Sequence, residues 1–202
     1  MSIQDLGARL IAAPQKGGRK MVALAGAPAS GKSTLAEGLV QYLRDEGYSA
    51  QVVPMDGFHL DNAILEPRGD LAVKGAPQTF DAEGFVHLVK RVQSEDQVYF
   101  PTFDRGLDKA VAGSGLIDRD CEIAVFEGNY LLFDVPVWRD LNPIWDISIR
   151  LDVPFDELER RLVQRWLDYG LTQDAAMARA LGNDIPNAQS VIDFALPADI
   201  VV

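Results

Sequence analysis

The sequence predicts an α/β domain of three layers, in which a mostly parallel sheet is covered by helices on both faces. The first observation behind this prediction is a set of short apolar runs, several of them separated by helical patterns; the runs are 21–25, 51–55, 123–126, 146–153 and 199–202. Strands that are apolar throughout and alternate with helices are typical of parallel sheets buried on both faces. The second observation is a glycine-rich segment, 26–31, that joins the first run directly to a helical pattern.

Helical periodicity marks four segments of the chain. Near the amino terminus, apolar residues recur at helical spacing without the layout of a signal peptide, so we expect an amphipathic helix that packs on the domain. Three further helices are expected at 35–47, 81–96 and 154–170, and the first and last of them end at a glycine. The segment 57–80 is rich in Gly and Pro and has no clear period, so we expect a functional loop there.

Length and composition limit the classes of function. The 202 residues are enough for one domain, 1–202, with a proper core. Because 19 Lys and Arg residues stand against 30 Asp and Glu, the net charge is −11, and neither nucleic acids nor anionic membranes are expected as partners. The single Cys121 excludes an internal disulfide framework, and no apolar run is long enough to span a bilayer. We expect a cytoplasmic protein, with monomer and homodimer both open.

The segment 26-GAPASGKST-34 matches the nucleotide-binding pattern G-x-x-x-x-G-K-[ST] and lies between a predicted strand and a predicted helix, as the motif requires. In such a loop, backbone N–H groups and a helix N-terminus bind phosphate oxygens, Lys32 reaches the β- and γ-phosphates, and the Ser33 hydroxyl binds Mg²⁺. The motif predicts a P-loop NTPase fold. The expected nucleotide-binding residues of the loop are Gly26, Ala27, Pro28, Ala29, Ser30, Gly31, Lys32, Ser33 and Thr34.

Two acidic residues directly follow other predicted strands. Because the carboxyl ends of parallel strands meet at one edge of the sheet, Asp56 is expected to face the γ-phosphate. There it can accept the proton of an attacking hydroxyl or help to hold Mg²⁺. Glu127 is expected to act on Mg²⁺, directly or through water. The alternative interpretations are an ordinary Asp-Gly turn at Asp56 and a solvated carboxylate at Glu127. The chain lacks the guanine-reading pattern N-K-x-D, which argues against a switch GTPase.

Two arginines lie one helical turn apart on the helix expected at 154–170. Arg161 and Arg165 share one face of it, an arrangement suited to closing over phosphates whose charge must be neutralised in a transition state. The alternative is that these arginines pair with Glu157 and Glu159 along a solvated face.

Five segments together resemble a known family; they are 26-GAPASGKST-34, 55-MDGFHLDN-62, 74-KGAPQTFD-81, 127-EGNYLL-132 and 183-NDIPNA-188. From about residue 20 to the C-terminus, the chain resembles the P-loop kinases that include uridine kinase, phosphoribulokinase and bacterial type I pantothenate kinase. It also looks like short bacterial proteins labelled fructose transport system kinases or nucleoside/nucleotide kinase-like proteins.

The resemblance implies an ATP- and Mg²⁺-dependent kinase in which Asp56 is the base and a helical lid, about 155–182, carries Arg161 and Arg165. It also implies that Asn187 lies beside the adenine ring. Substrate-contacting residues of the relatives lie on a strand and loop that correspond to 98–111 here. The candidate substrate-binding residues are Asp56, His59, Arg68, Lys74, Asp104 and Arg105.

Two departures from the family bear on the phosphoryl acceptor. Uridine kinases place a ribose-binding Asp where this chain has Gly75, and pantothenate kinases are considerably longer. We therefore expect transfer to a hydroxyl of a small polar metabolite, with a sugar such as fructose as the leading candidate, and nucleosides and pantothenate as alternatives. ATP is the expected donor, with GTP left open. A hypothesis of another class is a nucleotide-binding regulator, associated with a transport system, that hydrolyses ATP slowly.

Overall fold

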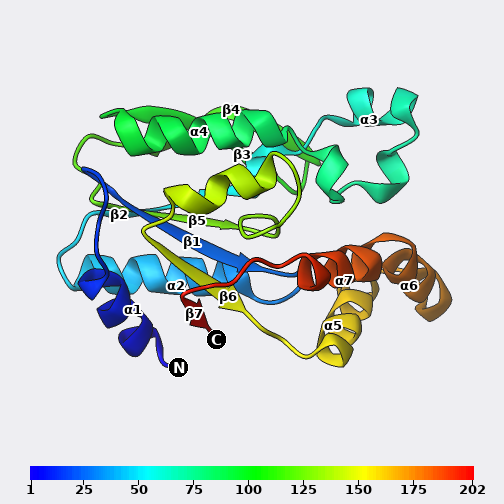
Figure 1. The fold of residues 1–202 in the computed structure, drawn as a ribbon. Coiled ribbons are helices and arrows are strands. Elements are labelled where there is room, and N and C mark those ends of the chain that lie inside the picture. The colour runs from blue at the N-terminus through cyan, green and yellow to red at the C-terminus, as the bar shows by residue number, and fades with distance from the viewer.

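A computed structural model describes all 202 residues, and its centre is a five-stranded parallel sheet with the strand order β2-β5-β1-β6-β7 (Figure 1). The strands are β1 (Lys20–Gly26), β2 (Ala50–Pro54), β5 (Ile123–Gly128), β6 (Ile147–Leu151) and β7 (Ile200–Val201). All five lie within or next to the apolar runs of the sequence. The α/β fold with a mostly parallel sheet is therefore confirmed.

Side chains from the two faces of the sheet pack into two separate apolar cores. Along β1, Val22 and Leu24 pack toward one core, while Met21 and Ala23 pack toward the other. Successive side chains of a strand point to opposite faces, so a strand covered on both sides is apolar at every position. This explains why β1 is a continuous apolar run, and every residue of it is buried.

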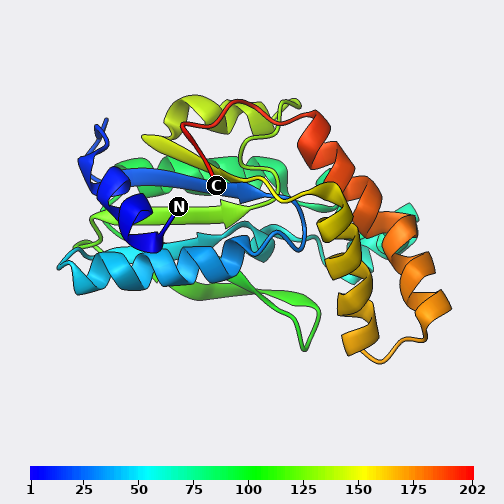
Figure 2. The same cartoon turned by 90° about the horizontal axis from the view of Figure 1, so that it is seen from below.

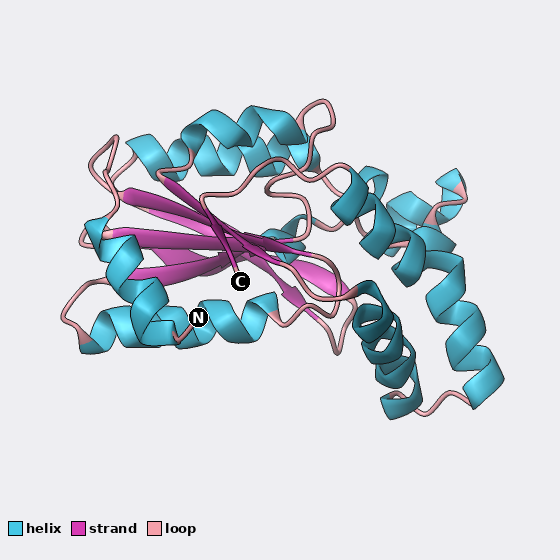
Figure 3. Cartoon of the chain, turned by 60° about the horizontal axis from the view of Figure 1, so that its bottom comes forward, coloured by secondary structure: helices cyan, strands magenta, loops and turns pink.

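Helices cover both faces and complete the three layers (Figures 1 and 3). The first core lies under α1 (Ile3–Ala12) and α2 (Lys32–Asp45), and the second lies under α4 (Ala82–Ser94) and a 3-10 segment, Trp138–Ile144. The amino-terminal helix begins at a capping box, and the buried ammonium of Lys20 donates to the carbonyl oxygens at its last turn. None of the helices combines the length and the apolar character that crossing a membrane requires.

Three helices lie beyond the carboxyl ends of the strands (Figure 2). They are α5 (Phe155–Asp168), α6 (Gln173–Arg179) and α7 (Ile185–Asp193), and a π-helical turn, Ala180–Asp184, joins the last two. The region expected to act as a lid, 155–182, covers α5, α6 and the first part of this turn. Pro154 is the residue before α5, and the acidic residues expected in its first turn are present.

The sequence pattern did not reveal two elements. An antiparallel hairpin, β3 (Val98–Asp104) and β4 (Lys109–Ile117), forms a separate two-stranded sheet. The segment 57–80 is not a continuous loop, because it contains α3 (Asn62–Arg68) and three short 3-10 turns. The helix α3 has only seven residues, with a proline near its end, and so shows no apolar period; Asp61 caps its start and Gly69 its end.

Arg19 lies just before β1, at the end of the sheet opposite the lid, and its side chain is buried. Its guanidinium has no carboxylate partner and donates instead to five carbonyl oxygens, those of Val92, Glu95, Asp96, Asp118 and Cys121. These oxygens belong to the end of α4 and to the segment that leads into β5. One side chain therefore holds three parts of the chain together at the amino-terminal edge of the sheet.

Replacing Arg19 should destabilise the fold strongly. Arg19→Met leaves several buried carbonyl oxygens without a donor, and we expect the free energy of unfolding to fall by about 3 kcal/mol or more. For a domain of this size that corresponds to a fall in Tm of roughly 6–12 °C, measurable by calorimetry. The matched control is Arg91→Met, which removes an exposed arginine paired with Glu95 and should leave Tm nearly unchanged. Equal losses in the two variants would contradict this account.

Candidate functional site

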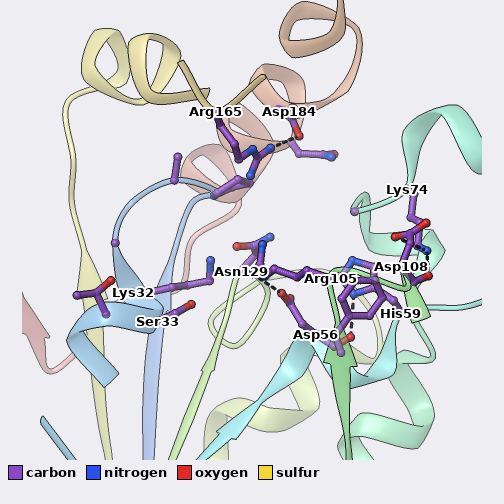
Figure 4. Close-up of a pocket in the computed structure, with 17 residues that line it drawn as sticks. Lys32, Ser33, Asp56, His59, Lys74, Arg105, Asp108, Asn129, Arg165 and Asp184 are labelled. Carbon is purple, nitrogen blue, oxygen red and sulfur yellow. Dashed lines mark hydrogen bonds and ion pairs between the residues drawn. The ribbon is translucent and has the colours of Figure 1, made fainter. Parts of the chain in front are cut away.

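A cleft with a volume of about 370 Å³ opens at the carboxyl ends of the strands, and 17 residues line it (Figure 4). Residues of the loop 26–34 form one side. The opposite side comes from the turn after β2, from the segment 74–75 and from the tip of the β3–β4 hairpin. Asn129, just after β5, and the helical region beyond the sheet, through Arg165, Asp184 and Asn187, contribute the rest. Six parts of the chain that are distant in sequence thus meet at one site.

The loop between β1 and α2 has the geometry of an anion site. Gly31 adopts a left-handed conformation (φ 92°) directly before α2 and makes no side-chain cap, so the first N–H groups of that helix have no intrahelical partner. Lys32, Ser33 and Thr34 form the first turn of the helix and line the cleft. Of the nine expected nucleotide-binding loop residues, Gly26, Ala27 and Ser30 are not among those that line it.

Two buried polar atoms near the cleft have no hydrogen-bond partner in the protein. They are Oγ of Ser30, within the loop, and Oδ1 of Asn129, just after β5. Because nearly all buried polar groups are paired in native proteins, each of these atoms calls for an explanation, and a bound ligand is one. The Ser30 hydroxyl and the free N–H groups of α2 can donate to a phosphate in the loop, whereas Oδ1 of Asn129 is an acceptor and fits a ligand hydroxyl or N–H group.

A hydroxyl and a carboxylate face each other beside the phosphate loop. Oγ of Ser33 donates to Oε2 of Glu127 at 3.2 Å, and Glu127 is only 5 % exposed. Burial raises the pKa of Glu127 above its usual value, although the nearby Lys32 opposes the shift. No cluster of three or more His, Cys, Asp or Glu side chains with metal-binding geometry occurs in the chain.

Asp56 lies across the cleft from the loop and is engaged by an arginine of the hairpin. NH2 of Arg105 donates to Oδ2 of Asp56 at 3.2 Å (Figure 4). The contact depends on Gly57, because a Cβ there would lie 2.0 Å from the carbonyl oxygen of Pro101 in β3. Only a glycine lets the hairpin approach so closely, and this approach brings Arg105 to the carboxylate.

His59 lines the cleft close to Asp56. Its Nδ1 lies 2.8 Å from the backbone oxygen of Asp56, and its ring packs between Phe80 and Phe103, with centroid distances of 4.0 and 4.7 Å. Burial lowers the pKa of His59, so the imidazole is neutral at neutral pH. The aromatic neighbours hold the ring in place at the cleft wall.

Lys74 belongs to a closed network on the side of the cleft opposite the loop 26–34. Its ammonium donates to Asn62 Oδ1 at 2.7 Å and to the carbonyl oxygen of Asp108 at 3.0 Å, and it pairs with the Asp108 carboxylate at 3.0 Å. Hydrogen bonds from Asn62 and Lys74 lower the pKa of Asp108, although partial burial opposes them. Because its three N–H donors are all engaged, Lys74 holds the hairpin tip against α3.

The two arginines of α5 have different surroundings. Arg165 lines the cleft and pairs with Asp184 at 2.8 Å. Arg161 does not line the cleft; it pairs with Glu157 at 2.7 Å, and its NH1 donates to the carbonyl oxygen of Ala29 at 3.3 Å. The expected pairing of α5 arginines with glutamates therefore applies to Arg161, while Arg165 faces the site.

Two candidate substrate-binding residues lie away from the cleft. Arg68, at the end of α3, is exposed and does not line the cleft. Oδ1 of Asp104 accepts hydrogen bonds from the N–H groups of Gly106 and Leu107, which makes it the turn-forming residue of the hairpin. The structure thus gives Asp104 a local backbone partner where substrate contact was expected.

Asn187 lines the cleft, and a chain of hydrogen-bonded side-chain amides holds it there. Its Nδ2 donates to Asn183 Oδ1 at 2.9 Å, and Asn183 in turn donates to the carbonyl oxygen of Lys74 at 2.9 Å. The chain links α7 and the π-helical turn to the segment that carries Lys74. A second tie on this segment is the hydroxyl of Tyr130, which donates to the carbonyl oxygen of Gly75 at 2.6 Å.

Five further cleft residues were not among the predicted site residues: Gly75, Phe103 and the polar residues Asp108, Asn129 and Asp184. Asn129 and Asp184 lie inside the segments 127–132 and 183–188, so their position in these motifs was a usable signal. Asp108 has a left-handed backbone (φ 52°) at the hairpin turn and is ordered by its bonds to Asn62 and Lys74. No local pattern marks it, because these partners are distant in sequence.

Comparisons with known proteins agree with this geometry. The family model "Chromatin associated protein KTI12" matches residues 20–66, which run from β1 into α3. "Putative uridine kinase C227.14" of Schizosaccharomyces pombe is 34% identical over 194 residues, with 91% of this chain and 83% of that protein covered. "Uncharacterized protein YggC" of Escherichia coli K12 is 32% identical over 192 residues, with 94% and 78% covered.

A solved structure is more similar still. The crystal structure of a "putative fructose transport system kinase" from Silicibacter sp. TM1040 is 53% identical and superposes with a TM-score of 0.96, covering 100% of this chain and 99% of that one. The resemblance expected from the five sequence segments is confirmed by these matches. The phosphate loop, the acidic residues at the neighbouring strand ends and the near full-length relatives lead to one conclusion: the chain belongs to the uridine kinase-like family of P-loop kinases.

Proposed function

We propose that this protein transfers the γ-phosphoryl group of ATP, with Mg²⁺, to a hydroxyl of a small polar metabolite, and that a sugar such as fructose is the leading candidate. The observation that carries the proposal is the position of Asp56, which shares one cleft with Lys32 and Ser33 of the phosphate loop. A relative named for uridine and a neighbouring structure named for fructose transport both support a kinase, and they point to different acceptors.

The donor side of the cleft fits a triphosphate. The free N–H groups of α2 and the ammonium of Lys32 supply positive potential where the chain as a whole carries a charge of −11. Lys32 binds the β- and γ-phosphates, and the loop amides hold the rest of the phosphate chain. The site can therefore bind a negatively charged ligand that the acidic surface of the rest of the chain repels.

Ser33 and Glu127 are the residues that would hold Mg²⁺. Their oxygen donors suit this ion, which prefers a few protein oxygens together with substrate phosphates and water. When bound, Mg²⁺ neutralises charge that develops on the transferring phosphoryl group.

Asp56 is the proposed base for the acceptor hydroxyl. Its carboxylate takes the hydroxyl proton as the acceptor oxygen forms a bond to the γ-phosphorus and the bond from this phosphorus to the β–γ bridging oxygen breaks. ADP then leaves with the electron pair of that bond. Arg105 engages only Oδ2 of Asp56, so hydrogen-bonding capacity remains for an acceptor.

The arginines of α5 divide the remaining work. Arg165 lines the cleft and is placed to neutralise charge on the transferring group once it exchanges its bond to Asp184 for a phosphate oxygen. Arg161 binds the backbone of the phosphate loop, and we assign it a positioning role. This assignment revises the expectation that both guanidiniums close over the phosphates.

The local geometry at Gly75 bears on the nucleoside alternative. Gly75 lines the cleft with a φ of 105°, a conformation that an L-residue such as Asp rarely adopts. The position at which uridine kinases carry a ribose-binding Asp is thus occupied by a glycine whose conformation disfavours an Asp. This favours a sugar over a nucleoside.

The function is tested by ADP production from Mg·ATP across a panel that includes fructose, other sugars, uridine and pantothenate. Stimulation by one acceptor would support the kinase and name its substrate. A slow rate that no acceptor alters would instead support the regulator hypothesis, in which nucleotide hydrolysis serves a partner protein.

Removing the Asp56 carboxylate should abolish most of the acceptor-dependent rate. For Asp56→Asn we expect kcat to fall by about 10²-fold or more, because general base catalysis contributes on this scale, while ATP affinity stays the same. The comparison variant is Asp45→Asn, which removes an exposed carboxylate at the far end of α2. A near-normal kcat in Asp56→Asn would refute the assignment.

Replacing Glu127 should stabilise the fold at neutral pH and weaken the binding of Mg²⁺. Because its folded-state pKa is raised, the folded protein holds this proton more tightly than the unfolded chain, and stability falls as pH rises from the usual glutamate value through the raised one. Glu127→Gln is therefore expected to raise Tm at neutral pH, at roughly 2–4 °C per kcal/mol, but not in acid.

The same variant should weaken the Mg²⁺-dependent part of ATP binding about tenfold, as measured by calorimetric titration with and without the ion. Glu66→Gln, which changes an exposed glutamate on α3, is the control and should alter neither quantity. A drop in Tm at neutral pH with unchanged Mg²⁺ dependence would overturn the interpretation.

A further inference from the structure

A second, larger groove continues from the cleft on the side away from the phosphate loop. Its volume is about 830 Å³, and its wall includes four cationic side chains, Lys74, Arg105, Arg165 and Arg179, against one carboxylate, Asp108. No residue of the loop 26–34 lines it. In a chain with a net charge of −11, this is a local reversal of sign next to the proposed acceptor site.

The cations of the groove differ in how far they are neutralised. The ammonium of Lys74 is engaged by Asn62 and Asp108, and Arg165 is paired with Asp184. Arg179 has no carboxylate partner: NH1 donates to the carbonyl oxygen of Ala72 at 3.0 Å, and the guanidinium lies 5.1 Å from the ring of Trp166. Most of its five N–H donors are therefore free for a ligand.

Arg105 is the second cation with spare capacity. Its side chain is 65% exposed, and its single ion pair, to Asp56, is long at 3.2 Å. Planar guanidiniums suit the bidentate binding of phosphate and carboxylate groups. Figure 4 shows Arg105 of the hairpin directed toward Asp56 and Arg165 of α5 directed toward Asp184, on different sides of the opening. An anion bound there would compete with Asp56 for Arg105.

We propose that the phosphoryl acceptor carries an anionic group, a phosphate or a carboxylate, which binds in this groove through Arg179 and Arg105. The inference rests on the proposed kinase function and narrows its substrate class from sugars in general to acidic or phosphorylated ones. The hydroxyl that reacts lies toward Asp56, and the anion lies toward α6. Binding of the anion to Arg105 also releases Oδ2 of Asp56 to accept the hydroxyl proton, which couples recognition of the acceptor to the base.

The groove walls are suited to a compact polar ligand. Phe103, Trp166 and Tyr169 supply flat apolar surfaces between the arginines, and the rings of the last two lie 5.8 Å apart. Sugar C–H faces pack well on such rings, while the hydroxyls remain available to the surrounding polar groups. The larger groove volume leaves room for a substituent beyond the reacting hydroxyl.

The test compares matched neutral and anionic acceptors with Mg·ATP: fructose, fructose 6-phosphate, gluconate and uridine. We expect an anionic compound to exceed fructose in kcat/KM by about 10²-fold, because two charge-assisted contacts are gained. Of the anions, fructose 6-phosphate and gluconate separate phosphate from carboxylate recognition. Fructose or uridine as the best acceptor would overturn the inference and leave the proposed kinase function standing, whereas no stimulation by any acceptor would count against both.

Arg179→Gln isolates the anion contact, because this side chain touches neither Asp56 nor the phosphate loop. KM for the anionic acceptor should rise about tenfold or more, with kcat and the KM for ATP changed less than about twofold. Arg179→Lys, which keeps the charge, should recover part of the loss. Arg9→Gln, an exposed arginine on α1, is the matched control. A rise confined to the KM for ATP would assign the groove to the nucleotide and overturn the proposal.

Binding is measured separately from turnover by calorimetric titration of each compound into protein saturated with Mg·ADP, which fills the phosphate loop. The anionic compound should bind, and Arg179→Gln should weaken its affinity about tenfold at unchanged Tm. Affinity that is indifferent to this substitution, or no higher for fructose 6-phosphate and gluconate than for fructose, would contradict the inference.

Discussion

The site depends on the register of three parallel strands. Leu24 of β1 and Pro54 of β2 both lie opposite Glu127 of β5, so the strands end together and deliver the phosphate loop, Asp56 and Glu127 to one place. A slip of one residue would turn each side chain to the other face of the sheet. The two apolar cores prevent such a slip, because alternate residues of β1 belong to different cores. Packing of the sheet thus sets the geometry of the chemistry.

The charged side chains of the cleft form two ion pairs whose cations a bound anion can engage instead. Arg105 with Asp56 and Arg165 with Asp184 hold opposite charges at the surface of the site in the absence of substrate. The Arg105–Asp56 pair is partly exposed and contributes little to stability, so exchanging one partner for a phosphate or carboxylate costs little. Asp184 is buried and also accepts a hydrogen bond from Trp166, so Arg165 is held more firmly. The protein therefore keeps its cations ordered while leaving them available.

Much of this arrangement followed from local patterns. The apolar runs and the glycine-rich loop located the strands, Lys32, Ser33, Asp56 and Glu127, because burial on both faces and a tight turn each leave a signature in adjacent residues. The hairpin left none: most of β4 is exposed, and its sequence lacks the alternation of a half-buried strand. For a related reason the sequence did not reveal that Asp104 caps the hairpin turn, since an acidic residue of a turn and one of a binding site look alike in sequence.

Long-range partners account for the remainder. The roles of Arg161 and Arg165 differ because one meets the backbone of Ala29 and the other meets Asp184, a distinction that depends on tertiary packing. Helical spacing places both on one face but cannot say what that face meets. In the same way, Asp108 acquires its ordered position only through residues of α3 and the segment after it.

The five hydrogen bonds from Arg19 to backbone carbonyl oxygens, here called the clasp, bear on how the chain folds. Its carbonyl partners lie between 73 and 102 residues away along the chain, so the clasp cannot form until α4 and the approach to β5 are in place. Contacts between such distant parts bear the cost of closing long loops and tend to form late in folding. Contacts that form late mainly lower the unfolding rate and have little effect on the folding rate. We therefore expect the contacts of Arg19 at the amino-terminal edge of the sheet to form late in folding and to slow unfolding of the native state.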